Sequence, residues 1–138
     1  MPKPSKESVA QVMKDMDLCM MTTHGAYGWL VSRPMSNNRQ VDWNGDSYFF
    51  TRADTRKVRD IERDSKVALD FQGEGVWLTI RGNASLHHDA QLMREHWTED
   101  IEKWFGHGLD EGGDDILLIK VTAKEAELYG PDEGIVEM

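Results

Sequence analysis

Apolar residues recur along this chain at two spacings, one typical of helices and the other of strands. The helical spacing of i, i+3, i+4 and i+7 occurs near the N-terminus, in the stripe Val9, Val12, Met13 and Met16. Ser5 stands before this stripe, where its hydroxyl is suited to cap a first turn. We therefore predict a helical N-terminus over residues 5–17.

Shorter apolar runs, separated by turn residues, predict strands. They cover residues 18–24, 29–35, 47–51, 66–71, 76–87 and 116–121, and the last run continues towards 127–129. Tight turns are favoured at GAYG (25–28) and at Asn44-Gly45. Pro34 has no amide hydrogen to donate to a neighbouring strand, so we expect its strand to end, bulge or lie at an edge there.

Two further helices are predicted between the strands. Thr55 is the N-cap of a short helix over 55–63. Asp89 caps a second helix, whose apolar stripe is Leu92, Met93, His96, Trp97, Ile101 and Trp104. Residues 106–115 are expected to form a loop, and residues 130–138 a loose tail.

Strands that follow one another through tight turns pair antiparallel, and closure into a barrel removes the edges of the sheet. The predicted fold class is therefore α+β, with an antiparallel β-barrel of about six strands and flanking helices. A length of 138 residues fits a single domain spanning 1–138.

Composition narrows the function classes. The chain has 25 acidic and 16 basic residues and a net charge of −9, which disfavours nucleic acid because its phosphates require a basic face. No segment approaches the ~18 apolar residues of a membrane span, and MPKPSKES lacks the apolar stretch of a signal peptide. The single Cys19 cannot form an internal disulfide. We expect a cytoplasmic protein that binds no membrane.

Against this acidic background, a cluster of cations and hydroxyls follows the aromatic run in YFFTRADTRK (48–57). The cluster comprises Thr51, Arg52, Thr55, Arg56 and Lys57. The predicted helix begins at Thr55, and a helix N-terminus favours an anion through its free amides and its dipole. Arginine and lysine then suit a phosphate group. The alternative is a solvated loop whose cations pair with Asp54, Asp60 and Glu62.

A second cation, Arg33, interrupts the apolar run WLVSRPM (29–35). Burying a guanidinium without a partner is costly. Arg33 is therefore expected either to have a partner or to face water from an edge strand.

Together these stretches resemble the pyridoxamine 5′-phosphate oxidase-like flavoproteins, and more closely their general-stress-protein branch. The resemblance runs from Leu18 to Leu128. It rests on Met21-Thr22-Thr23, Arg33-Pro34-Met35, Phe49-Phe50-Thr51, Thr55-Arg56-Lys57, Ile80-Arg81-Gly82-Asn83-Ala84 with Asp89, and Trp104-Phe105 with Gly108. It implies a split β-barrel, a homodimer, and FMN bound in a groove between the subunits.

The resemblance also implies roles for individual residues. Arg33 and Lys57 would hold the FMN phosphate, and Thr51, Thr55 and Arg56 would complete the grip. The backbone of Arg33, Pro34, Met35 and Ser36, and that of Phe50, would follow the ribityl chain and the flavin ring. Trp77 would reach the flavin from the partner subunit, or else be a core residue, and the segment at Trp104 would approach the pocket.

The sequence departs from the oxidases near its C-terminus. Those enzymes use an Arg-x-His element for the substrate phosphate, whereas here no arginine follows Arg94 and no histidine follows His107. Tyr129 stands where they place a tryptophan against the flavin. We therefore do not expect oxidation of pyridoxamine 5′-phosphate. A redox protein or oxidoreductase with an unknown small substrate, and a non-enzymatic flavin sensor or carrier, both remain open.

The identity of the ligand also stays open at this point. FAD offers the same first phosphate as FMN, a deazaflavin would fit the same groove, and haem would need His24 or His107 as an axial ligand. A metal site is not expected, because His87 and His88 point to opposite faces of their strand and His96 lies on a helix. Cys19 and His24 likewise face opposite sides, which disfavours a thiol nucleophile.

Overall fold

A computed structural model describes residues 4–14, 16–36, 43–106 and 115–138, with only the backbone of Asp100 and Trp104. The predicted loop 106–115 therefore lies almost entirely outside the described residues. None of the described helices combines the length and the apolar character required to cross a lipid bilayer.

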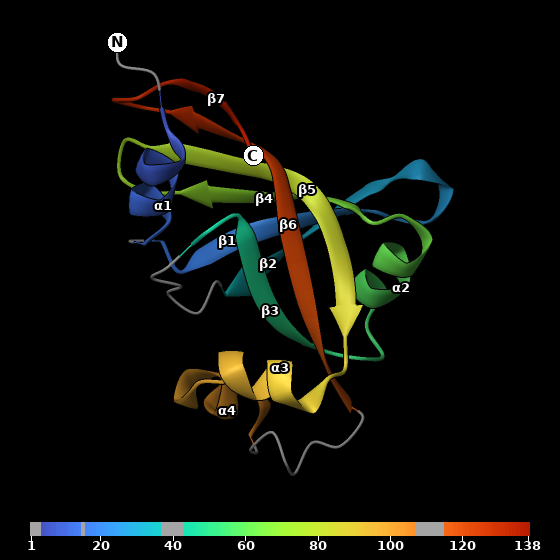
Figure 1. Cartoon of the computed structure of the whole chain (residues 1–138). Helices are drawn as coiled ribbons and strands as arrows, with labels where there is room; N and C mark the ends of the chain where they lie inside the picture. Colours follow the sequence, from blue (N-terminus) through green and yellow to red (C-terminus); the bar gives the residue numbers. More distant parts are fainter. Residues whose placement is uncertain (1–3, 15, 37–42, 107–114) are drawn as a thin grey trace.

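The described elements are mixed α and β, as predicted (Figure 1). In chain order they are α1 (Lys6–Lys14), β1 (Leu18–His24), the short 3₁₀ turn η1 (Ala26–Gly28), β2 (Leu30–Ser36), β3 (Asp46–Arg52), α2 (Arg56–Arg63), β4 (Lys66–Gln72), β5 (Trp77–His87), α3 (Ala90–His96), α4 (Glu99–Phe105), β6 (Ile116–Tyr129) and β7 (Gly134–Glu137).

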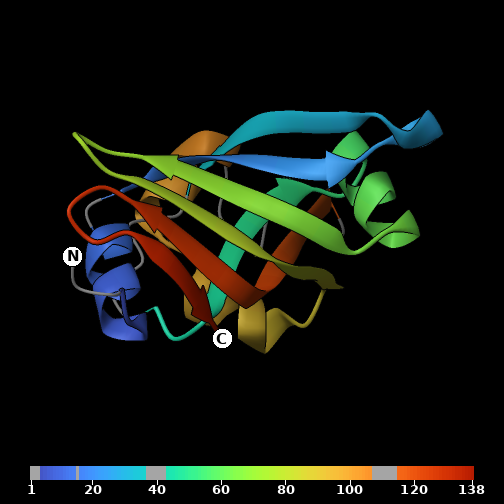
Figure 2. The ribbon, with the colours of Figure 1, turned by 90° about the horizontal axis from the view of Figure 1, so that it is seen from above.

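The strands form one antiparallel sheet in the order β2-β1-β4-β5-β6-β3, with β7 added on β6. The sheet curves around its own interior, as the view from above shows (Figure 2). Among the described strands no hydrogen-bonded ladder joins β2 to β3, so the barrel is not closed there. Pro34 accordingly lies on a strand at the edge of the sheet, which is one of the placements expected for it.

Strand alternation places the core inside this curved sheet. In β1, Cys19, Met21 and Thr23 are buried while their neighbours are more exposed. The largest side chains of the interior come from several strands and include Phe49, Phe71, Leu69, Ile80 and Ile119. A smaller cluster around Met93, Ile116 and Leu118 packs α3 and α4 against the far ends of β3 and β6.

Gly82 permits a local irregularity in the longest pairing. The register of β5 against β6 shifts between Arg81 and Gly82. A Cβ atom at position 82 would collide with the backbone carbonyl of Thr122, so the two strands approach too closely for any side chain. The curvature of the sheet at this point thus depends on a residue without a side chain.

Two sequence expectations about elements were wrong. The single helix predicted after Asp89 is two helices, because the chain leaves the helical conformation at Trp97 and Thr98 caps α4 by accepting a hydrogen bond from the amide of Ile101. Residues 134–137 form β7 and not a loose tail, since they pair with Glu125 to Leu128 of β6. The sheet therefore has seven strands where about six were expected.

Candidate functional site

A pocket of about 330 Å³ lies where the two unpaired edges of the sheet face each other. The start of β1 and the end of β2 form one wall, the end of β3 forms the other, and the first turn of α2 and one face of α4 complete it. Its lining residues are Leu18, Pro34, Met35, Ser36, Phe50, Thr51, Arg52, Thr55, Lys57, Ile101 and Phe105. The volume is at the lower end of the roughly 300–1,000 Å³ that is usual for small-molecule sites.

Lys57 brings a cation to the polar end of this pocket. Its Nζ donates a hydrogen bond of 2.8 Å to Oγ1 of Thr51, which is 5 % exposed at the end of β3. Thr55 lies 3.5 Å from the same hydroxyl. No acidic side chain in the described part of the chain lies within ion-pair distance of Lys57.

The first turn of α2 faces the same place. Thr55 occupies the N-cap position, as predicted, but its side chain does not cap the helix; its hydroxyl instead donates to the carbonyl of Arg52 at 3.0 Å. The first turn contains no acidic residue. The amides at this helix end are therefore left without a side-chain acceptor, in the orientation that favours an anion.

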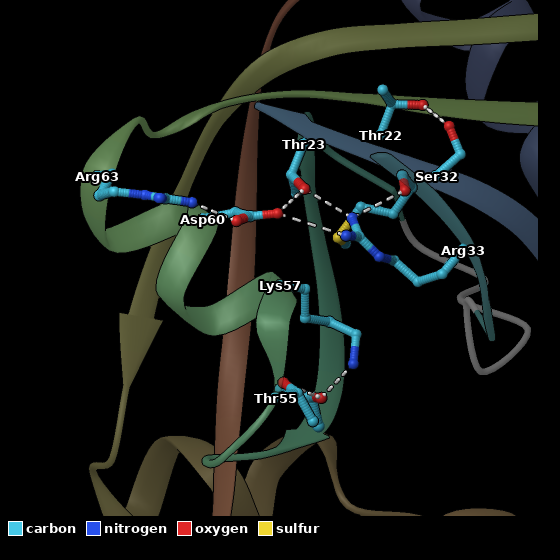
Figure 3. Close-up of polar contacts among 10 residues, drawn as sticks. Thr22, Thr23, Ser32, Arg33, Thr55, Lys57, Asp60 and Arg63 are labelled. Atoms are coloured by element: carbon cyan, nitrogen blue, oxygen red, sulfur yellow. Dashed lines mark hydrogen bonds and ion pairs between the residues drawn. The ribbon is translucent and has the colours of Figure 1, made fainter. Parts of the chain in front are cut away.

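Arg33 reaches the site from β2, opposite α2 (Figure 3). Its Nη1 donates to Oγ1 of Thr23 at 2.8 Å and to the carbonyl of Met21 at 3.2 Å. Its Nη2 lies 3.6 Å from Oδ2 of Asp60, a carboxylate that is only 1 % exposed. Of the two placements left open by the sequence, Arg33 therefore has a partner, and its side chain is 17 % exposed.

The cations disfavour one another's charge. Burial lowers the pKa of Lys57, and the nearby charge of Arg33 lowers it further. Burial also lowers the pKa of Arg33; Asp60 partly opposes this, and the charge of Arg56 adds to it. Lys57 and Arg33 thus carry two positive charges in a partly desolvated space, where Asp60 pairs with Arg33. Arg56 is exposed and lines a neighbouring hollow with Asp60 and Glu62. An anion placed between Lys57 and Arg33 would therefore be stabilised.

The structure brings most of the predicted site residues together. Pro34, Met35, Ser36, Phe50, Thr51, Thr55 and Lys57 line the pocket. Arg33 is not in the lining but lies within electrostatic reach of Lys57. Arg56 acts electrostatically on Arg33, but it is exposed and lines a neighbouring hollow with Asp60 and Glu62.

Trp77 does not line the pocket; it lies with Met20 and Tyr129 in a second hollow that shares Leu18 and Pro34 with the pocket. At 46% exposure Trp77 is also not a core residue of this chain. The side chain of Trp104 and all of His107 lie outside the described residues.

Some residues of the pocket were not predicted. Leu18, Ile101 and Phe105 give it apolar walls. Arg52, which the sequence placed in the cationic cluster without a role in the site, lies with its guanidinium carbon 5.2 Å from the centre of the Phe105 ring. The sequence indicated Phe105 indirectly, because Phe105 follows Trp104 in the segment that was expected to approach the pocket. It gave no such indication for Leu18 and Ile101, which have the pattern of ordinary core residues. Asp60 was considered only as a counter-ion on a solvated loop, whereas it is a buried partner of Arg33.

None of the histidines that the structure describes lines the pocket, and neither does Cys19. His24 lines a different hollow, on the side of the sheet that carries Lys66 and Arg81. His96 stacks on Tyr48 with ring centres 3.7 Å apart. Burial, the largest cause, raises the pKa of Cys19 to about 12, which makes its thiol a poor nucleophile. No group of metal-ligating side chains occurs among the residues that the structure describes.

The family model described as "Pyridoxamine 5'-phosphate oxidase like" matches residues 4–137. The chain belongs to this family. Protein bli-3 of Neurospora crassa is 29% identical over 111 residues, which cover 76% of this chain and 53% of that relative. The chain therefore spans about half the length of this relative.

Solved structures of this pyridoxamine 5′-phosphate oxidase-like family share the split-barrel fold. A Clostridium acetobutylicum protein, described as related to general stress protein 26 of Bacillus subtilis, superposes with a TM-score of 0.82 at 19% identity, covering 96% of this chain and 93% of that one. A Nostoc punctiforme protein, described as pyridoxamine 5′-phosphate oxidase-related and FMN binding, gives a TM-score of 0.67 at 11% identity, covering 90% and 82%. The predicted family and fold are thus confirmed.

Proposed function

We propose that this protein binds FMN in the pocket between β2 and β3, with the phosphate held by Arg33, Arg56 and Lys57. It would act as a redox protein or oxidoreductase on a small substrate, in the general-stress-protein branch of its family. The observation that carries the proposal is the position of Lys57 beside a helix N-terminus and within electrostatic reach of Arg33, with no acidic side chain of the described residues at ion-pair distance from Lys57.

The donor set fits a phosphate monoester. Arg33 offers N–H groups in a planar fork, Lys57 adds a point charge, and the hydroxyls of Thr51 and Thr55 lie beside it. Family membership and the Nostoc protein described as FMN binding support a flavin as the bearer of that phosphate.

The rest of the pocket fits a flat, largely apolar ring system. Pro34 and Met35 lie on one side, and Phe50, Ile101 and Phe105 on the others. Bound flavin supplies one- and two-electron redox chemistry, while this chain supplies position, charge and exclusion of water. His24, one of the two histidines considered as a haem ligand, lines a different hollow, and His107 lies outside the described residues.

The C-terminal segment offers no cation that could bind the phosphate of a phosphorylated substrate. AELYGPDEGIVEM (126–138) contains three glutamates, one aspartate and no cation. This composition favours a small substrate without a phosphate, or a flavin sensor or carrier with no substrate of its own. FAD and deazaflavins are alternatives for the same phosphate grip.

The test is a flavin titration with a built-in control for the phosphate. Purified protein is titrated with FMN, FAD and riboflavin while absorbance and flavin fluorescence are followed. FMN is expected to bind tightly and riboflavin poorly. Lys57→Ala and Arg33→Ala are each expected to weaken FMN binding by about 1.5–3 kcal/mol, the scale of a hydrogen bond to a charged group.

Riboflavin binding should be nearly unaffected by the same two substitutions. Lys14→Ala, which removes an exposed cation on α1, serves as the matched control and should change neither affinity. Absence of flavin binding by the wild type at tens of micromolar would remove the proposal. An equal loss of riboflavin and FMN binding in the variants would show that these cations do not contact the phosphate.

A further inference from the structure

Arg33 lies on an edge strand, yet its guanidinium is held in one direction. A long, flexible side chain at such an edge loses rotamer entropy when it is fixed, so a fixed orientation requires contacts. Two donors from Nη1 go to Met21 and Thr23, and Nη2 approaches Asp60. No hydrogen bond from Nε is found among the described residues, so part of the guanidinium stays available for a ligand.

The contacts form a directional chain. The Thr23 hydroxyl has one hydrogen, which it donates to Oδ2 of Asp60 at 2.8 Å, and it therefore accepts from Nη1 of Arg33 at 2.8 Å. Thr23 and Asp60 are each only 1 % exposed. The other carboxylate oxygen, Oδ1, accepts from Nη2 of Arg63 at 2.5 Å, which holds Asp60 in place from the far side (Figure 3).

The helix that carries Asp60 also carries Lys57. The two residues are three positions apart on α2, so their side chains lie on the same side of the helix. One helix thus supplies a cation for the ligand directly and fixes the direction of a second cation through Thr23 on β1. The spacing between Arg33 and Lys57 is consequently set by how α2 docks on β1.

We propose that Asp60, acting through the Thr23 hydroxyl, is the positioning residue that directs Arg33 at the bound phosphate. Neither residue touches the ligand. This role rests on the proposed function, in which Arg33 binds the phosphate. Thr23 and Asp60 would then adjust the affinity of the site for a phosphorylated ligand. A purely structural role would instead stabilise α2 without favouring a phosphorylated ligand over an unphosphorylated one.

The test compares FMN with riboflavin in four single variants. Thr23→Val removes the hydroxyl and keeps the branched shape, Thr23→Ser restores the hydroxyl, and Asp60→Asn removes the charge at nearly constant size. Ile61→Val, at a buried position of α2 with no polar contact to Arg33, is the matched control for loss of stability. Thermal unfolding of each variant is measured alongside the affinities.

Thr23→Val and Asp60→Asn are expected to weaken FMN binding about tenfold, the scale of one misdirected charge-assisted hydrogen bond. Riboflavin binding should stay unchanged, Thr23→Ser should restore FMN affinity, and Ile61→Val should leave the preference for FMN intact. In an Arg33→Ala background, Thr23→Val should cause no further loss, because its effect passes through Arg33.

Three outcomes would overturn the inference: losses of FMN and riboflavin affinity in equal measure, a full additional loss in the Arg33→Ala background, or a loss of FMN preference in Ile61→Val as large as that in Thr23→Val. A wild type that binds FMN no better than riboflavin would contradict the proposed phosphate site itself. The two failures are therefore distinguishable, because the first leaves the preference of the wild type for FMN in place.

Discussion

At the scale of single residues, the site depends on charges that are unfavourable where they stand. Lys57 follows Arg56 in the first turn of α2, where the helix dipole opposes cations, and among the described residues its one hydrogen-bond acceptor is the neutral Thr51 hydroxyl. Burial and Arg33 both lower its pKa below that of an ordinary lysine. Such an arrangement costs stability in the free protein and becomes favourable when an anion is bound.

The lowered pKa of Lys57 predicts a pH dependence of phosphate recognition. The anion binds the protonated amine, so FMN affinity should be constant below this pKa and should fall as the pH rises through it. In Lys57→Arg the charge persists, and the fall should move to higher pH. Titration of FMN from pH 7 to pH 10 measures this, and riboflavin controls for ionisation of the ring.

The same shift has a consequence for the free protein. The unfolded chain binds more protons than the folded one between the lowered pKa and the ordinary pKa of lysine, so stability should rise with pH across that interval. If FMN affinity depended on pH in the same way in the wild type and in Lys57→Arg, the side chain that titrates at the phosphate site would not be Lys57.

At the scale of elements, helix ends decide where the pocket walls lie. α4 contributes Ile101 and Phe105 to the wall, and its start is fixed by the Thr98 hydroxyl, which accepts from the amide of Ile101 at 3.4 Å. The break before Thr98 allows α3 and α4 to take different directions over β3 and β6 (Figure 1). A single continuous helix would not place both stretches against the sheet.

Removal of this cap should therefore loosen the wall of the pocket. Thr98→Ala is expected to reduce the free energy of unfolding by about 0.5–2 kcal/mol, the usual contribution of an N-cap. It should weaken FMN and riboflavin binding to a similar degree, because the wall faces the ring and not the phosphate. Thr98→Ser, which keeps the hydroxyl, is the control, and denaturant unfolding measures the change; a selective loss of FMN would contradict this role of α4.

The docking of α2 is a second effect at this scale. The sequence identified Arg33, Arg56 and Lys57 through local patterns, and those residues do converge. It gave no indication that Asp60 would be buried under them, since an aspartate between arginines on a short helix is equally suited to a solvated face. Only the contact of α2 with β1 brings Thr23 and Asp60 into hydrogen-bonding distance.

At the scale of the whole molecule, one face of the sheet carries apolar side chains without cover among the described residues. They are Leu18, Met20, Trp77, Tyr129 and Ile135, whose exposed fractions range from 41% to 61%. These residues come from β1, β5, β6 and β7, and four of them border the same hollow. Asp70, Gln72 and Thr79 border the same hollow, and a group of exposed large apolar side chains rimmed by polar residues is typical of an interface.

We expect this face to be the contact between two copies of the chain. Light scattering should return about twice the 15.8 kDa of one chain at micromolar concentration. Trp77→Glu should favour the monomer, because it would bury an unpaired charge in an apolar interface, whereas Gln11→Glu on the exposed side of α1 should not. A wild type that is monomeric with flavin bound would contradict this expectation.

The overall charge distribution also limits the substrate. Wild type loaded with FMN should show negligible oxidation of pyridoxamine 5′-phosphate. A phosphorylated substrate needs its own cationic anchor, and in our proposal Arg33, Arg56 and Lys57 already hold the phosphate of the cofactor. A steady-state assay that follows pyridoxal 5′-phosphate tests this at millimolar substrate. Turnover near 1 s⁻¹, the lower end typical of enzymes, would show that Lys66, Arg81 or Arg94 supplies an anchor.

The sequence by itself determined what local physics decides. Alternation of apolar residues predicted the strands, and the run Thr55-Arg56-Lys57 predicted a cationic helix start. The lack of an amide hydrogen at Pro34 predicted that its strand would end, bulge or lie at an edge, and the edge is what the structure has. These predictions depend on neighbours within a few positions. The helix break was missed because the apolar stripe continues at helical spacing through Trp97, where the chain leaves the helical conformation before Thr98 caps α4. The strand β7 was missed because its four residues form a strand only through their pairing with β6.

The tertiary structure alone decided which distant residues share an environment. Arg33 has a partner because α2 docks on β1 and brings Asp60, 27 positions further along the chain, next to it. The pocket exists because β2 and β3 are not paired with each other at the two ends of the curved sheet. Burial, and with it the lowered pKa of Lys57, follows from that packing and not from the residues next to it in sequence. Local sequence specifies donors and charges, and long-range packing sets the distances at which they act.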